Sequence, residues 1–126
     1  MPPYDLIERT RLFALSVIAL CRTLPRTDEA REAAGQLRRA ANGVRSNYRA
    51  ARRGRSYAEF KAKLGVAYEE ADESADWLRY LRDSNISHDA ALIEEAEALA
   101  RILAASVKTA RSNGRRRQRQ KESEGL

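Results

Sequence analysis

The chain has 126 residues, which is long enough for one hydrophobic core and too short for two ordinary domains. Its 24 basic and 18 acidic residues leave a net charge of +6, and so basic a chain favours a polyanion or an acidic protein as partner. The single cysteine excludes an intramolecular disulfide and any metal site that needs several cysteines. No apolar run has membrane-spanning length and no signal-peptide pattern opens the chain, so we expect a cytoplasmic protein with no membrane partner.

The composition predicts an all-α protein. Alanine is frequent, and the three prolines stand at positions 2, 3 and 25, whereas strands and turns normally bring β-branched residues, glycine and proline with them. We expect helices at about residues 5–24, 28–53, 57–83 and 88–112, and a basic, disordered tail over residues 113–126. Four helices with short connections pack most simply as an antiparallel up-down-up-down four-helix bundle, here over residues 1–112.

The first two expected helices have recognisable ends and apolar faces. The first begins at Asp5, which opens a capping-box-like string, and its wide apolar stripe predicts contact with more than one neighbour. The second begins at Thr27 and ends at Gly54. Its apolar face consists mainly of small residues and the helix contains Gly35 and Gly43, so we expect a neighbouring helix to approach it closely.

The last two expected helices begin at serine residues. Ser56 and Glu59 form a capping box for the third helix. Ser87 is the expected cap of the fourth helix, which should end near Asn113 and Gly114, where the chain turns polar and basic.

Positive charge is concentrated in residues 36–55, which contain seven arginines and no acidic residue. The seven are Arg38, Arg39, Arg45, Arg49, Arg52, Arg53 and Arg55. A helical projection places those at positions 38, 45, 49 and 52 in one stripe. Because like charges one turn apart repel, either acidic residues of a neighbouring helix or phosphates outside the protein must relieve the repulsion. Charge alone does not choose between these two alternatives.

A second basic run lies in the expected tail, where it either binds nucleic acid through its charge or serves as a solubilising terminus. The two runs together define the candidate nucleic-acid-binding residues. These are Arg38, Arg45, Arg49, Arg52, Arg53, Arg55, Arg115, Arg116, Arg117 and Arg119.

Negative charge is concentrated on the third expected helix, which has five acidic residues between positions 69 and 76. Glu70 and Glu73 project near Trp77 at the border of the apolar face. They either pair with arginines of the second helix in the same chain or take part in a subunit interface. Glu70, Glu73 and Trp77 are therefore the candidate interface residues.

The sequence offers little for catalysis. His88 is the only histidine, and the string Ser87-His88-Asp89 is no catalytic triad, because adjacent residues at a helix start do not face one another. A di-iron site in a bundle needs Glu-x-x-His motifs, and no phosphate-binding glycine loop is present. We expect no enzymatic activity, no cofactor and no metal site.

Residues 36–51, Gln-Leu-Arg-Arg-Ala-Ala-Asn-Gly-Val-Arg-Ser-Asn-Tyr-Arg-Ala-Ala, resemble the signature of the four-helix-bundle family encoded in 23S ribosomal RNA intervening sequences. Matching positions continue from Ser56 to Trp77-Leu78, and the opening Arg9-Thr10 also fits. The chain departs from the usual pattern at Asn42-Gly43, Ala50 and Glu69. The second departure makes the arginine surface more basic, and the third makes the third helix more acidic.

The resemblance implies a long four-helix bundle that assembles into a homopentameric ring, with no catalytic activity. It also implies a relation to the accessory variability determinant of diversity-generating retroelements, which binds nucleic acid and its reverse transcriptase. We therefore expect a homo-oligomer that binds structured RNA or DNA through phosphates with little sequence specificity. Two alternatives remain: a scaffold that docks an acidic partner such as a reverse transcriptase, and a ring joined by Arg38 and Arg45 against Glu70 and Glu73 with no nucleic-acid role.

Overall fold

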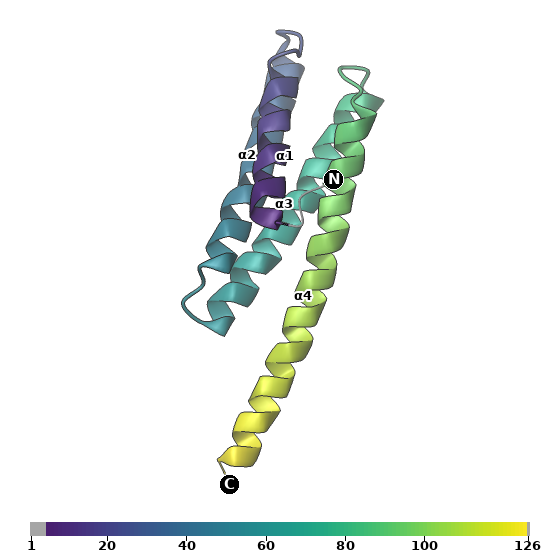
Figure 1. Ribbon diagram of the computed structural model, residues 1–126. Coiled ribbons are helices and arrows are strands. Elements are labelled where there is room, and N and C mark those ends of the chain that lie inside the picture. The colour runs from purple at the N-terminus through teal and green to yellow at the C-terminus, as the bar shows by residue number, and fades with distance from the viewer. Residues whose placement is uncertain (1–4, 126) are drawn as a thin grey trace.

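The computed structural model describes residues 5–125, and this part of the chain is all-α, with four helices and no strand. The helices are α1 (Leu6–Cys21), α2 (Asp28–Arg52), α3 (Tyr57–Asp83) and α4 (Ala90–Glu124) (Figure 1). The predicted all-α class and the number of helices are confirmed. The predicted bundle starts at residue 1, and its residues 1–4 lie outside the described part of the chain.

Each helix packs against the helices next to it in the chain, and α4 also contacts α1. In Figure 1 the α1–α2 and α3–α4 connections lie at one end of the molecule, whereas the α2–α3 connection and the C-terminal part of α4 lie toward the other. With 16 residues, α1 is the shortest helix and reaches about 24 Å, against about 38 Å for the 25 residues of α2. The end of the molecule that holds the α2–α3 connection is therefore built from three helices.

The helix starts follow from side chains that accept hydrogen bonds from the first free backbone N–H groups. Asp5, Thr27 and Ser56 cap α1, α2 and α3 as predicted, with the Ser56 hydroxyl accepting from the N–H of Glu59 at 3.1 Å. The predicted cap of the fourth helix was wrong. Ser87 still donates its N–H to the carbonyl of Leu81 in α3, and α4 is capped instead by the carboxylate of Asp89.

Leucine and small side chains fill the core. The largest fully buried side chains come from all four helices and include Phe13, Leu37, Leu64 and Leu99. The outer side of α1 carries a row of exposed apolar residues, namely Ile7, Leu12, Leu15 and Ile18, each between 37% and 47% exposed. The wide apolar stripe of this helix therefore has one buried part, against α2 and α4, and one part without a neighbour in the described chain.

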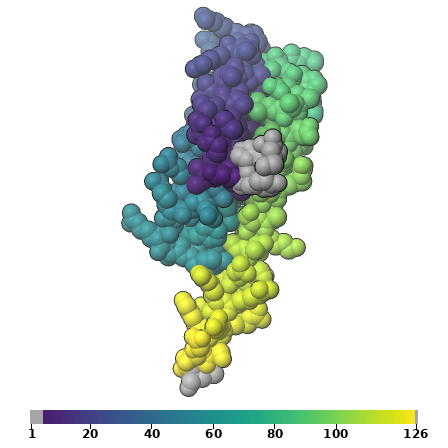
Figure 2. Space-filling view, viewed as in Figure 1, coloured from purple at the N-terminus to yellow at the C-terminus, as the bar shows by residue number. Residues whose placement is uncertain are grey.

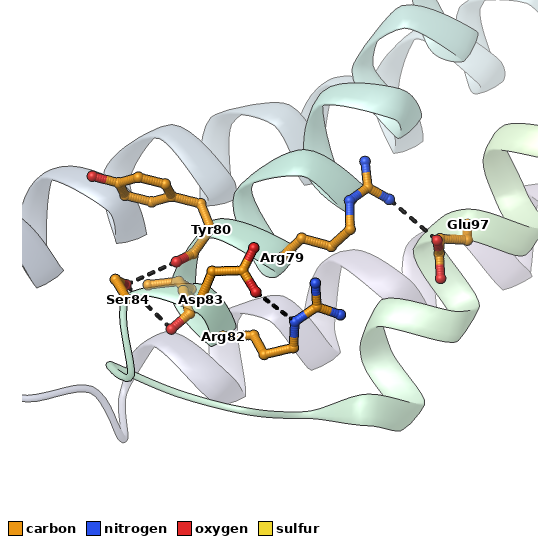
Figure 3. A network of polar contacts seen from close by, with 7 residues as sticks. Arg79, Tyr80, Arg82, Asp83, Ser84 and Glu97 are labelled. Atoms are coloured by element: carbon orange, nitrogen blue, oxygen red, sulfur yellow. Dashed lines mark hydrogen bonds and ion pairs between the residues drawn. The ribbon is translucent and has the colours of Figure 1, made fainter.

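The α3–α4 connection is held by side-chain contacts at the end of α3 (Figure 3). The Ser84 hydroxyl lies 2.8 Å from the carbonyl oxygen of Tyr80, where it can donate to a carbonyl that the helix end leaves free. Asn85 follows with a φ of 61°, a left-handed conformation that asparagine tolerates. One turn earlier, Arg79 reaches across to Glu97 of α4 at 3.2 Å.

The expected disordered tail is wrong, because α4 continues as a helix to Glu124 and extends beyond the rest of the molecule (Figure 2). The segment contains no proline and consists mainly of Arg, Gln, Lys and Glu, which are good helix formers. Side-chain hydrogen bonds one turn apart support it, from Gln118 to Glu122 at 3.2 Å and from Gln120 to Glu124 at 3.1 Å. Gly114, which we read as a helix end, is an internal helical residue.

Candidate nucleic-acid interface

The arginines of α2 are spread along the helix, with Arg38 and Arg52 about 21 Å apart at ~1.5 Å per residue. Arg38 lies near the α1–α2 connection, in a groove of about 450 Å³ that Cys21 and Leu24 also line. Arg45 donates two hydrogen bonds to Asn42 of its own helix, at 3.0 and 2.8 Å, and Arg49 is exposed. Arg38 therefore belongs to a different part of the surface from Arg52.

Arg52, Arg53 and Arg55 are all exposed and lie where α2 ends and the chain turns into α3. Gly54 makes this turn tight, since a Cβ at this position would lie 3.0 Å from the carbonyl oxygen of Ala51 and 3.2 Å from the N of Phe60. The start of α3 is thus drawn close to the end of α2. Three guanidinium groups are consequently confined to one short connection.

The C-terminal part of α4 reaches the same end of the molecule through Tyr57. The Tyr57 hydroxyl donates a hydrogen bond to the carbonyl of Ala110 at 2.6 Å, and the guanidinium of Arg117 lies over its ring at 4.3 Å. Gly114 permits this contact, because a Cβ there would lie 3.0 Å from Lys61 Nζ and 3.3 Å from the Tyr57 ring. We call Arg52, Arg53, Arg55, Lys61 and Arg117 the basic end.

The other three candidate arginines of the C-terminal segment make none of the contacts around Tyr57. Arg115 lines a groove of about 350 Å³ together with Glu69 of α3 and Lys108 of α4. Arg116 and Arg119 are exposed. The structure therefore joins only Arg117 of the four tail arginines to the contacts around Tyr57.

None of the ten candidate arginines forms an ion pair with another residue between positions 5 and 125. The ion pairs in this part of the chain use other arginines, for example Arg9 with Glu95 at 2.7 Å. The first alternative for the arginine stripe, neutralisation by acidic residues of the same chain, is therefore not observed among the described residues. The five side chains of the basic end therefore form no ion pair within this part of the chain.

The acidic residues of α3 likewise have no arginine of α2 as ion-pair partner within residues 5–125. Burial, reinforced by the nearby carboxylates of Glu73 and Glu69, raises the pKa of Glu70. Its side chain lies against Gly43 of α2, where a Cβ would be only 2.8 Å away. At Gly43 the predicted close approach is made by this side chain of α3. At Gly35 the prediction was wrong, because nothing lies within 4 Å of a Cβ placed there.

Trp77, the third candidate interface residue, is half-buried against the core. Its indole N–H lies 3.4 Å from the Glu73 carboxylate, and its ring meets that of Tyr80 edge-on with 5.5 Å between centroids. The assignment of these residues to a subunit interface remains a prediction.

Sequence reasoning missed a groove of about 560 Å³ between α2, α3 and α4, which we call the aromatic groove. Its walls include Tyr48 and Arg52 from α2, Phe60 from α3, and Ile102 and Asn113 from α4. Tyr57 lines both this groove and a second one of about 370 Å³ that contains Arg117. The sequence signal was that aromatic residues lie close together along the chain, with Tyr48 near the end of α2 and Tyr57 and Phe60 at the start of α3.

No group of three or more His, Cys, Asp or Glu residues within positions 5–125 is arranged to hold a metal ion. His88 is exposed beside the cap of α4, and burial raises the pKa of the Cys21 thiol. Over the same described part of the chain, no helix combines the length and apolar character that a membrane crossing requires.

The fold and the site define a four-helix protein of the all-α class whose candidate site is made of unpaired basic and aromatic side chains. The family of 23S rRNA-intervening sequence proteins matches over residues 4–105, and the chain belongs to this family. A search of curated proteins gives no match. A solved structure from the S23 ribosomal protein family, a protein of unknown function from Bacteroides thetaiotaomicron, is similar with a TM-score of 0.73. It shares 21% sequence identity over 86% of this chain and 99% of the other, so the likeness concerns the fold.

Proposed function

We propose that this chain is a non-catalytic, cytoplasmic nucleic-acid-binding protein that contacts the phosphates of structured RNA or DNA with little sequence specificity. The observation that supports it is the basic end, where the side chains of Arg52, Arg53, Arg55 and Arg117 form no ion pair among the described residues. Arginine binds phosphate through two parallel hydrogen bonds, and phosphate contacts carry no base information. Family membership is compatible with an RNA ligand.

We further propose that the four helices form an up-down-up-down bundle and that several copies assemble, as a pentameric ring by resemblance. Within residues 5–125, the seven arginines between positions 38 and 55 and the five acids between positions 69 and 76 form no ion pair, which supports an assembly in which one copy neutralises the next. Glu70, Glu73 and Trp77 would lie at that contact. Such an assembly should loosen at high salt, and light scattering across a salt series measures its mass.

The test of nucleic-acid binding is fluorescence anisotropy with a labelled RNA hairpin and a matched DNA duplex across a salt series. Submicromolar binding at low salt that weakens steeply with added salt supports phosphate contacts. Absence of binding to both probes at low salt contradicts the proposal.

A second candidate function is a scaffold that docks a protein partner such as a reverse transcriptase. The exposed apolar residues of α1 favour it, above all Leu12, Leu15 and Ile18 at successive helical turns, because exposed apolar patches are typical of protein interfaces. Affinity capture with purified partner separates the two functions: a scaffold retains the partner after its nucleic acid is digested.

A further inference from the structure

The aromatic groove lies along the part of α2, α3 and α4 that α1 does not cover. No residue of α1 lines it, because this helix begins at Leu6 and lies along the part of α2 that is near the α1–α2 connection (Figure 1). The open volume of about 560 Å³ lies within the range of small-ligand sites, about 300–1,000 Å³. The groove is therefore large enough for a flat heterocycle with an attached sugar.

The walls of the groove are suited to a flat ring. Leu64 is buried at its base, while Tyr48 and Phe60 are half-buried and present ring surface. Tyr57 is held in place by its hydrogen bond to Ala110 and by Phe60, whose ring centroid lies 5.8 Å away. A preorganised set of aromatic side chains offers stacking without an ordering cost on binding.

The polar groups of the groove suit a neutral ring that carries a phosphate. Thr109 and Asn113 line it from α4 with hydroxyl and amide groups that can donate and accept hydrogen bonds. Ser106 also lines it, and its hydroxyl, which donates to the carbonyl of Ile102 at 2.9 Å, can accept a hydrogen bond. Arg52 lines the groove as well, and no carboxylate does. On the other side of Tyr57, Arg117 and Lys121 line the second groove together with Glu124, so basic side chains lie on both sides of Tyr57.

We infer that the aromatic groove receives an unpaired base of a nucleic-acid single strand, with the neighbouring phosphates on Arg52 and Arg117. The inference rests on the proposed function and deepens it. A base inside a duplex is stacked and paired and cannot enter such a groove, whereas bases of loops and single strands stack readily on aromatic side chains. The protein should therefore prefer single strands to duplexes.

The test measures anisotropy of the full chain with a labelled single strand of about 12 nucleotides, as RNA and as DNA, and with the same strand annealed to its complement. The double variant Tyr48→Leu with Phe60→Leu removes the rings and keeps apolar side chains in the groove. Tyr80→Leu is the matched control, since it removes an exposed aromatic residue from α3 outside the groove. Circular dichroism verifies that both variants are folded.

The double variant should weaken single-strand binding about 5- to 100-fold and leave duplex binding unchanged, as loss of base stacking requires. In the unmodified chain, crosslinks from a 4-thiouridine strand should map to the peptides that contain Tyr48 or Phe60. Equal affinity of the double variant and the control, or crosslinks confined to other peptides, overturns the groove assignment while phosphate binding stands. Absence of binding to every probe at low salt refutes the proposed function, and the inference with it.

Discussion

The sharpest test of the basic end is to neutralise its three connection arginines together, in the variant Arg52→Gln, Arg53→Gln and Arg55→Gln. All three side chains are exposed and lack an acidic partner within residues 5–125, so each can release one counterion per phosphate contacted. The slope of log affinity against log salt should then become shallower by about 2 on a single strand and by about 2.7 on duplex DNA. Anisotropy titrations at several salt concentrations measure this slope.

A matched control separates local contacts from total charge. Arg11→Gln, Arg31→Gln and Arg82→Gln lower the net charge by the same amount, at two exposed residues and one half-buried residue that are paired with acids of their own helices. Such pairs contribute at most about 1 kcal/mol each, so the control should stay folded. It should keep the slope of the parent chain. An unchanged slope in the basic-end variant, or an equal change in both, refutes the assignment of phosphate contacts to the α2–α3 connection.

Three further predictions concern the scaffold. Gly35→Ala should raise the free energy of unfolding by about 1 kcal/mol, because alanine favours the helix. Gly43→Ala should raise it less, since its Cβ would lie 2.8 Å from Glu70. Equal increases for the two variants in urea denaturation would contradict the close approach at Gly43. Because the pKa of Glu70 is raised on folding, the free energy of unfolding should fall as pH rises from about 4.5 through the raised value. Glu70→Gln should remove this fall and be more stable than the parent chain at neutral pH. Identical pH–stability curves for the two proteins would argue against a raised pKa at Glu70. Tyr57→Phe should keep the fold but weaken hydrogen-exchange protection of residues 113–121 by about 1 kcal/mol, since it loses the hydrogen bond to Ala110. If these residues show no protection in the parent chain, the original prediction of a disordered tail is correct instead.

Local rules predicted most of the fold. The caps at Asp5, Thr27 and Ser56 were found from their side chains alone, because each satisfies a backbone N–H within three residues. The ends of α4 were missed for a different reason. Ser87 does not cap it because its N–H belongs to the turn that ends α3, where it bonds to the carbonyl of Leu81. The C-terminal extension was missed because Asn113 and Gly114 predict a stop, whereas the good helix formers that follow continue the helix and Tyr57 packs against Gly114.

The candidate site was predictable only as far as charge is local in sequence. The run from Arg52 to Arg55 stays together because a tight turn at Gly54 follows α2 directly. Arg38 separates from it because a straight helix carries the two residues about 21 Å apart, although they project onto the same side. A projection down the helix axis discards this distance, so it overstated the size of one continuous surface.

The aromatic groove could not be found from any one helix, because α2, α3 and α4 form it together and the shortness of α1 leaves it open. A full-length α1 would bury Tyr48 and Phe60 as ordinary core residues and hold their rings away from any ligand. The same brevity leaves Tyr57 free to hold the extended α4, which brings Arg117 to the groove that Arg52 lines. Basic and aromatic groups thus meet at the one end of the bundle where a helix is missing, and binding of an unpaired base requires both kinds of group together.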